Sequence, residues 1–401
     1  MRERVVRAQA GRVRLFARCS LARAALVGTL AACGTEQAGN SGRDGPPAGY
    51  VQQPLEGHAL TLPRGFSIAV YAEDLPGVRL MALGPDGGVY ATLTEAGRVV
   101  RVGDPDGNGT ADRVVTVADG LELPHGLAFR GDTLHVAESH RVVRFDRPGA
   151  SPTIVVANLP ADGGHFTRTI LFQRDHLFIS VGSSCNICDE MDPRRAAVVR
   201  YRLDGSNQTL FATGLRNSVG LALHATTGEI WATNNDRDNL GDDLPPDRVN
   251  ILREGGFYGW PFCYLPNQPN PEYQRTAARC AEAIGPAVVL PAHAAPLGLA
   301  FYQGEMFPAE YRGDLFIALH GSWNRSVPIG YEVVRVDIEN GRPVGEPLSF
   351  VSGWLEGRRG AVNRVAGTGW GRPVDVLGLP DGSLLISDDE GGRIYRVTYA
   401  R

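Results

Sequence analysis

The sequence contains no lysine, because all 40 of its basic residues are arginine. This absence excludes reactions that need a lysine Schiff base, and it excludes a nucleotide-binding P-loop, whose lysine contacts the phosphates. Any anion that binds this protein must therefore be held by arginine, by histidine or by backbone N–H groups.

Other sequence patterns of known chemistry are missing as well. The chain has no GxSxG, no HExxH, no Rossmann glycine fingerprint and no phosphate loop. Its formal net charge is −4, only 8% of its residues are aromatic, and no basic stripe is interleaved with aromatics, so nucleic-acid binding is not expected. Chemistry in this protein would then come from a bound cofactor or metal.

Glycine and proline are abundant, with 50 Gly and 27 Pro and strand-like apolar runs between them. This alternation of apolar runs with glycine and proline is typical of short strands joined by turns. Six segments repeat one pattern, in which a polar start, a strand, an Asp-Gly or similar turn, a second strand and a polar tip precede a third strand. No apolar period of 3.6 residues persists, which excludes a helical solenoid. The six segments begin at Arg79, Pro124, His165, Gly214, His293 and Arg372.

Repeats of about 40 residues or more, each with short antiparallel strands, indicate a β-propeller. We therefore predict an all-β, six-bladed β-propeller with a cofactor site at one mouth of its central channel. The strand Phe66–Ala72 precedes the first repeat and is expected to complete the last blade, which would close the ring and suppress exposed strand edges. Residues 255–280, between the fourth and fifth repeats, are expected to form an insertion on one face.

The N-terminus has the pattern of an export signal. Six arginines lie between residues 2 and 18, a short apolar core follows at 21–32, and the sequence Leu-Ala-Ala-Cys ending at Cys33 resembles a bacterial lipobox. The apolar run is too short to span a bilayer. We predict a lipoprotein-type signal segment at 1–33, a flexible tether at 34–57 and the propeller domain at 58–401. The alternatives are a plain secretory signal and a misplaced start of the sequence.

This reading places the protein outside the cytoplasm, as a membrane-anchored lipoprotein that faces the periplasm or the cell surface. A lipid on Cys33 would then be its only contact with the membrane. In an exported protein, an even set of cysteines indicates disulfides, so the pairs Cys185–Cys188 and Cys263–Cys280 are predicted to be oxidised. A zinc site built from these two pairs is the alternative.

The start of each repeat and the tip after its second strand are expected at the same end of the propeller, because strand alternation and hairpin geometry bring them together. Arginines there suit an anionic ligand, residues 235–243 offer oxygen ligands for Ca²⁺, and a histidine can act as a general base. This convergence predicts a functional pocket. The repeat starts are Arg79, His125, His165, Arg216 with Asn217, His293 and Arg372.

A second acidic loop, residues 104–112, has the alternating Asp and Asn spacing of a small Ca²⁺ loop, but it lacks the glutamate at position 12 of an EF-hand. A hairpin turn with solvated carboxylates explains it equally well. We therefore leave it out of the predicted metal ligands.

The motifs GGHFTRTILF, GLRNSVGLAL, GGFYGWP, HGSWNR and GRPVDV followed by DGSLLISDD occur in this order. Together they resemble the quinoprotein sugar dehydrogenases of the soluble glucose dehydrogenase and sorbosone or pyranose dehydrogenase type, over about residues 60–397. The resemblance implies a six-bladed propeller that holds pyrroloquinoline quinone (PQQ) and Ca²⁺ at the channel mouth. The implied reaction is oxidation of an aldose or related sugar aldehyde by hydride transfer to PQQ. We expect a cytochrome or a quinone as the electron acceptor.

The same resemblance implies roles for individual residues. His165 matches the general base that takes the proton from the sugar hydroxyl. Arg216 and Asn217 match a pair that contacts the quinone oxygen, where Arg216 would stabilise the charge that develops on reduction. Asp236 and Arg237 match loop residues whose main-chain carbonyls ligate Ca²⁺, the Lewis acid of the reaction.

Two further cofactor contacts follow from the fifth and sixth repeats. Arg372 matches an arginine that binds a PQQ carboxylate. The glucose dehydrogenase branch has a lysine in the fifth blade, whereas this chain has His320 and Arg325 there, as in the sorbosone-like branch. Both are predicted to bind the cofactor, and the substrate is predicted as an aldose or related sugar aldehyde rather than as glucose in particular.

Two other functions are compatible with part of this pattern. A Ca²⁺-dependent lactone hydrolase on a six-bladed propeller would use the acidic loop and His165, but it gives no reason for several arginines to converge. A propeller that binds a glycan or a protein without catalysis is the other alternative, since propellers host many functions.

Overall fold

The computed structural model describes residues 46–104, 106–355 and 369–400. Residues 46–401 form one compact unit. Its described part consists of 29 strands and two 3-10 segments, η1 (Pro271–Ala281) and η2 (Ala309–Tyr311). The predicted signal segment, Cys33 and residues 34–45 of the predicted tether lie outside the described residues.

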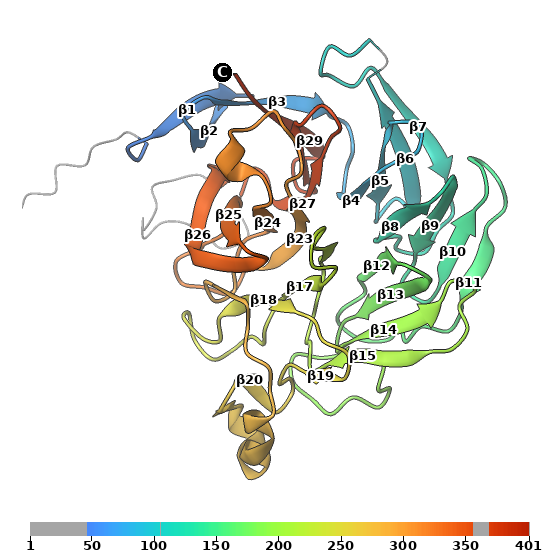
Figure 1. Cartoon of the computed structure of the whole chain (residues 1–401), viewed down its shortest axis with the longest axis vertical. Coiled ribbons are helices and arrows are strands. Elements are labelled where there is room, and N and C mark those ends of the chain that lie inside the picture. Colours follow the sequence, from blue (N-terminus) through green and yellow to red (C-terminus); the bar gives the residue numbers. More distant parts are fainter. Residues whose placement is uncertain (1–45, 105, 356–368, 401) are drawn as a thin grey trace, which may run out of the picture. The chain divides into compact units, whose positions relative to one another are not determined.

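Six antiparallel sheets follow one another along the chain, one for each predicted repeat (Figure 1). In the first three sheets the strands follow the order of the chain. Blade 1 contains β4 (Val78–Leu83), β5 (Val89–Leu93), β6 (Arg98–Gly103) and β7 (Arg113–Ala118); blade 2 contains β8 (Leu127–Arg130), β9 (Thr133–Ala137), β10 (Val142–Phe145) and β11 (Thr153–Val156); blade 3 contains β12 (Arg168–Gln173), β13 (His176–Val181), β14 (Ala197–Arg202) and β15 (Thr209–Thr213).

The other three sheets keep this four-stranded plan, and in blades 4 and 6 the outer strand comes from a more distant part of the chain. Blade 4 contains β16 (Leu221–Leu223), β17 (Ile230–Asn234), β18 (Asp247–Ile251) and β22 (Val288–Leu290); blade 5 contains β23 (Pro296–Phe301), β24 (Leu315–Leu319), β25 (Glu332–Glu339) and β26 (Arg342–Ser352); blade 6 contains β27 (Pro373–Gly378), β28 (Leu384–Asp388), β29 (Arg393–Tyr399) and β3 (Phe66–Ala72).

The second strand of a blade is covered on both of its faces. All five residues of β5, β17, β24 and β28 are buried, and their sequences are short, mostly apolar runs such as VYATL and LFIAL. In blade 6 a tight turn precedes the second strand, β28. This turn uses Gly382, whose φ is +88° and where a Cβ would lie 2.6 Å from the backbone nitrogen of Met306.

The innermost strands close a ring around the channel. β4 contacts β8, β8 contacts β12, and the series continues through β16, β23 and β27 back to β4. The outer strand of blade 6 is β3, which pairs antiparallel with β29 from Phe66 opposite Tyr399 to Ala72 opposite Ile394. The predicted six-bladed propeller and its closure by Phe66–Ala72 are therefore confirmed.

An insertion separates β18 from β22. It contains β19 (Gly256–Phe257), which pairs in parallel with β15 of the preceding blade, then the hairpin of β20 (Cys263–Leu265) and β21 (Gln268–Pro269), and then η1. A disulfide joins Cys263 and Cys280 across it, as predicted. In Figure 1 the insertion is the gold segment at the lower edge of the ring.

The predicted tether ends too late in the sequence. β1 (Tyr50–Leu55) pairs with β2 (His58–Pro63), and β2 joins β26, so these strands extend the sheet of blade 5. Leu60 and Leu62 are fully buried in the core that blade 5 shares with blade 6, which holds the hairpin in place. The structure therefore places residues 50–57 in the folded unit. Among the described residues, no helix has the length and apolar character that a membrane crossing requires.

Candidate active site

One cavity of about 400 Å³ gathers most of the predicted channel-mouth residues. Its walls come from blades 1, 3, 4, 5 and 6. His125 of blade 2 does not reach it, because this side chain is fully buried within the protein and does not line the cavity. The predicted residues that line the cavity are Arg79, His165, Arg216, Asn217, Asp236, His293, His320 and Arg372.

The ring of His165 is held in one orientation by the loop that follows β13. Its Nδ1 lies 2.8 Å from the carbonyl oxygen of Ser183, and the hydroxyl of Ser183 donates to the carbonyl of Cys185 at 2.6 Å. Because both Ser183 oxygens accept at the histidine, Nδ1 must carry the proton. The lone pair of the neutral ring is then on Nε2, the nitrogen that can accept a proton from a substrate.

His165 also sits among guanidinium groups. Burial lowers its pKa to about 4, and the positive charges of Arg216, Arg168 and Arg195 act in the same direction, while the hydrogen bond to Ser183 opposes them. His165 is therefore neutral near pH 7 and available as a base.

The backbone around His165 leaves little freedom. Arg168 is fully buried and donates to the carbonyl oxygens of His165 at 2.9 Å and Thr167 at 2.7 Å. Gly182 packs directly against the histidine, since a Cβ at this position would lie 2.6 Å from Cβ of His165 and 2.7 Å from Oδ1 of Asn217. Only glycine fits there without displacing one of these two residues.

Arg216 forms part of the same wall, with each of its five N–H donors engaged by a protein oxygen. Nε and one N–H of Nη2 bond the main-chain and side-chain oxygens of Asn186, both at 3.0 Å. Nη1 bonds the carbonyls of Asn235 at 3.3 Å and Asp236 at 2.7 Å, and Nη2 bonds the carboxylate of Asp238 at 3.0 Å. A direct N–H contact from Arg216 to a ligand would have to replace one of these bonds. Its charge acts on the cavity without such a contact.

The opposite wall carries a second charged group built on Asp389. This carboxylate accepts from Nη1 of Arg79 at 2.6 Å and from Nε2 of His320 at 2.8 Å. Burial raises the pKa of Asp389, but His320 and the guanidinium groups of Arg79 and Arg372 lower it to about 2. Burial holds the pKa of His320 at about 4, so His320 is neutral and donates its Nε2–H to the ionised Asp389. Two arginines against one carboxylate leave this wall with excess positive charge.

Two predicted residues have side chains outside the cavity. Arg325 turns away to the loop of blade 4, where it bonds the carbonyl of Asp242 and pairs with Asp243 at 3.0 Å, so its side chain does not line this cavity. The side chain of Arg237 pairs with Glu272 of η1 at 2.5 Å. The direction of each of these two side chains is set by an acidic partner on a neighbouring loop. The local sequence does not reveal that partner.

Other residues of the cavity were not predicted to have an individual role. Asp238, within the loop 235–243 that was expected to offer oxygen ligands, uses its carboxylate to accept from Arg216 at 3.0 Å and from Nδ2 of Asn324 at 2.7 Å. Trp323 lines the cavity with 64% of its surface exposed. Asn186, which holds Arg216, was missed because its segment was read only as a disulfide. Its position just after the tip of blade 3, Ser183-Ser184, was the available signal.

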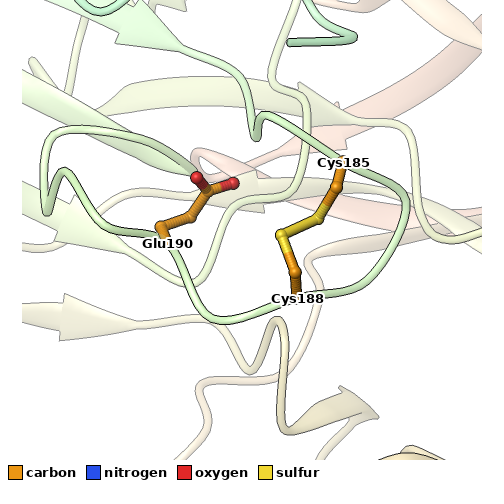
Figure 2. A group of neighbouring side chains, drawn as sticks. All are labelled: Cys185, Cys188 and Glu190. Atoms are coloured by element: carbon orange, nitrogen blue, oxygen red, sulfur yellow. A yellow bond between two sulfur atoms is a disulfide. The ribbon is translucent and has the colours of Figure 1, made fainter. Parts of the chain in front are cut away.

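Two groups of described residues could in principle hold a metal. The first is Cys185, Cys188 and Glu190 (Figure 2), but the two sulfurs form a disulfide and offer no thiolate. Both predicted disulfides are thus confirmed, and the zinc alternative is wrong. The second group is Asp104, Asp106 and Asp112 of the acidic loop, where Asp104 also accepts from the backbone N–H groups of Asn108 and Gly109.

The family model for TrAA12-like proteins matches residues 60–400. The chain is 32% identical to an uncharacterized protein of Borreliella burgdorferi, over 72% of this chain and 79% of that protein. It is 26% identical to a pyrroloquinoline quinone-dependent pyranose dehydrogenase of Coprinopsis cinerea, over 85% of this chain and 55% of that protein. The chain thus spans about half the length of the Coprinopsis relative.

Solved structures resemble the fold over most of the chain. The calcium structure of a Trichoderma reesei carbohydrate-active enzyme of family AA12 has a TM-score of 0.75 at 22% identity, over 87% of this chain and 99% of that one. The holo PQQ domain of the Coprinopsis cinerea pyranose dehydrogenase has a TM-score of 0.73 at 23% identity, over 86% and 98%. At these identities the likeness supports the fold.

Proposed function

Because the chain belongs to the TrAA12-like family, we propose that it is a quinoprotein oxidoreductase that oxidises an aldose or related sugar aldehyde, with PQQ bound in the cavity and Ca²⁺ beside it. The observation that carries the proposal is the cavity itself, in which a neutral His165 faces walls of buried arginines. A pyranose dehydrogenase and its PQQ domain among the similar proteins support the same assignment.

The residues present fit the charge of PQQ, which carries three carboxylates. Arg372 uses Nε and Nη2 on the carbonyls of His320 at 3.0 Å and Gly321 at 2.8 Å, and its Nη1 has no hydrogen-bond partner among the described residues. Arg79 has a buried Nε without a partner in the same part of the chain. Two guanidinium donors are thus left for anionic groups, and the volume lies within the ordinary range for a small-molecule site.

The oxygen donors for Ca²⁺ come from blade 4. We propose the main-chain carbonyls of Asp236 and Arg237 as ligands, as the family resemblance implies. Asp236 lines the cavity, and Asp238 and Asp247 place further oxygen atoms in the same wall, which suits a hard cation. The carboxylate of Asp236 pairs with Arg248 at 2.5 Å, and its main-chain carbonyl also accepts from Nη1 of Arg216 at 2.7 Å, so a Ca²⁺ ion would share this carbonyl with Arg216 or displace it.

When bound, PQQ supplies the hydride acceptor and Ca²⁺ polarises it. The chain supplies the base: Nε2 of His165 takes the proton of the sugar hydroxyl, and the Ser183 carbonyl stabilises the resulting imidazolium through Nδ1–H. Burial and the charge of Arg216 keep the ring unprotonated between turnovers. Negative charge in the cavity offsets the guanidinium groups, and it therefore raises the pKa of His165 towards the range in which a base is most effective.

We also propose that the protein is exported and held at the membrane by a lipid on Cys33, and that a cytochrome or quinone takes its electrons. Two disulfides support an oxidising compartment, because such bonds persist there.

A titration of the purified apoprotein with PQQ in the presence of Ca²⁺, followed by absorbance, tests the proposal directly. Saturable binding is expected, followed by dye reduction with members of a panel of aldoses and sugar aldehydes. An absence of PQQ binding contradicts the proposal. Turnover of lactones without PQQ would instead identify a hydrolase.

A further inference from the structure

The loop between β13 and β14 lies against the active site and is braced internally. A disulfide joins Cys185 to Cys188, and Glu190 accepts from the backbone N–H of Ser184 at 2.6 Å and from its hydroxyl at 2.8 Å. Figure 2 shows the disulfide and the carboxylate of Glu190 within this one loop. Only two residues lie between the two cysteines, which leaves Asn186 little conformational freedom.

Both polar atoms of the Asn186 side chain, and its main-chain carbonyl, form hydrogen bonds with residues of the neighbouring blade. Its carbonyl accepts from Nε of Arg216 at 3.0 Å and from Nε1 of Trp260 at 3.1 Å. Its Oδ1 accepts from Nη2 of Arg216 at 3.0 Å and from the backbone N–H of Asp238 at 2.8 Å, and its Nδ2 donates to the carbonyl of Asp238 at 3.2 Å. One residue of blade 3 thus supplies two of the five acceptors of Arg216 and fixes the backbone of Asp238.

The same loop also controls the histidine. Ser183 accepts from Nδ1 of His165 through its carbonyl and donates its backbone N–H to the carbonyl of Arg216 at 2.7 Å. His165 and Arg216 therefore both bond the same loop, through Ser183 just before the disulfide-closed turn and through Asn186 within it. A shift of that loop would change the distance between the base and the guanidinium group that, together with burial, keeps it neutral.

We propose that Asn186 is the positioning residue for Arg216. We also propose that the Cys185–Cys188 disulfide is a brace that fixes this loop, so that Arg216 keeps its position relative to His165. The importance of this for turnover rests on the proposed function, whereas the placement of Arg216 beside His165 is a property of the protein without ligands. Asn186 acts through Arg216 and does not line the cavity itself.

The test uses Asn186→Ala in the full-length apoprotein, with Ile187→Ala as the matched control in the same loop. Ile187 contributes none of the side-chain hydrogen bonds that hold Arg216. NMR titration of labelled histidine reports the protonation of His165 without any cofactor. In Asn186→Ala, Arg216 loses an acceptor and moves, so the midpoint of His165 should rise from about 4 towards its ordinary value of 6.5, while Ile187→Ala stays at the wild-type midpoint.

A second variant tests the role of the disulfide. Cys185→Ser/Cys188→Ser should shift the His165 midpoint in the same direction by a smaller amount, and it remains informative if Asn186→Ala fails to fold. An unchanged midpoint in Asn186→Ala, or an equal shift in Ile187→Ala, overturns the role of Asn186. An unchanged midpoint in the double serine variant overturns the brace.

Steady-state assays complete the comparison in protein loaded with PQQ and Ca²⁺. Asn186→Ala should lower kcat by about tenfold to a hundredfold, the effect of losing one hydrogen bond to a charged group, with a smaller change in PQQ affinity. If wild-type protein neither binds PQQ nor reduces dye, the proposed function fails, and the NMR comparison still decides the positioning of Arg216.

Discussion

At the scale of single residues, the behaviour of His165 is determined by its neighbours. The carbonyl of Ser183 fixes its tautomer, and Gly182 leaves it no room to move aside. Burial and three arginines keep it unprotonated. The same imidazole on an exposed loop would be half protonated near pH 6.5 and would offer either nitrogen.

Because only the neutral ring can accept a proton, activity should fall as the pH falls through the pKa of His165. We expect kcat/KM to decline as the pH falls, with a midpoint above the value of about 4 that His165 has in the protein without ligands, because the carboxylates of bound PQQ offset the guanidinium groups. A pH–rate profile measured with saturating PQQ and limiting sugar checks this. An acid limb centred at or above 6.5 would show that burial and the arginines do not keep the ring neutral in the loaded protein. His165→Ala should cost roughly 10² to 10⁴ in rate at neutral pH while leaving PQQ binding largely intact.

Gly182→Ala should impair both stability and turnover. The new Cβ would lie 2.6 Å from Cβ of His165, which cannot rotate away. Overpacking of this kind costs about 1–3 kcal/mol, and a displaced base lowers kcat further. The control is Gly378→Ala at the end of β27, where no atom lies within 4 Å of the added Cβ. Denaturant unfolding and kcat for the two variants are the measurements, and equal behaviour would contradict the packing argument.

Arg372 and Arg325 make a matched pair for testing the cofactor site. Arg372 lines the cavity and its Nη1 has no partner among the described residues, whereas Arg325 lies outside the cavity and pairs with Asp243. Arg372→Ala should raise the Kd for PQQ by about tenfold to a hundredfold, because one carboxylate loses a charge-assisted partner. Arg325→Ala should leave that Kd within about twofold. A larger effect of Arg325→Ala would restore the placement predicted from the sequence.

At the scale of elements, β3 closes the ring, because this early strand pairs with the last strand of the chain, β29. It supplies the outer strand of blade 6, and its Phe66 meets aromatic rings of two blades. The ring centroids of Phe307 and Phe350 in blade 5 lie 4.8 and 5.0 Å from it, and that of Tyr399 in blade 6 lies at 4.9 Å. Phe66 thus packs where the closing strand crosses between neighbouring blades.

Phe66→Ala should therefore destabilise the propeller by about 3–5 kcal/mol, through lost burial and the cavity that remains. Its side chain is only 2% exposed. The adjacent exposed Ser67 provides the control, since Ser67→Ala on the same strand should change the free energy of unfolding by less than about 0.5 kcal/mol. Urea or guanidinium unfolding of both variants separates the two outcomes, and similar stabilities would mean that the closure does not depend on this aromatic cluster.

At the scale of the whole molecule, one cavity draws on five blades that are distant in sequence. A ligand there touches residues from blade 1 to blade 6, so it binds only when the ring is closed. Binding to the folded state alone stabilises a protein by mass action.

PQQ with Ca²⁺ should accordingly raise the melting temperature of the apoprotein. At a free concentration of 100 times Kd the gain is about 2.7 kcal/mol, and it grows with the logarithm of concentration. Differential scanning fluorimetry at several PQQ concentrations checks this, with Arg372→Ala as the variant in which the curve shifts to higher concentration. A melting temperature that does not respond to PQQ would contradict a cofactor site in the folded ring.

The sequence by itself determined the architecture of this protein. Six repeats of a strand–turn–strand pattern predict six blades, since each pattern is local and its period counts the blades. The closing strand Phe66–Ala72 was predictable because it stands alone before the first repeat. The positions at the repeat starts, such as His165 and Arg372, were predictable because equivalent positions of a propeller meet at one mouth.

Only the tertiary structure decided where individual side chains point and which loops meet. Arg325 and Arg237 turn to acidic residues that are distant in sequence. Residues 50–55, predicted as tether, form the strand β1, which pairs with β2 and so extends the sheet of blade 5. Asn186 reaches Arg216 across 30 positions of sequence. Such contacts depend on the packing of one blade against the next, and a pattern read along a single repeat carries no information about the partner that the neighbouring blade presents.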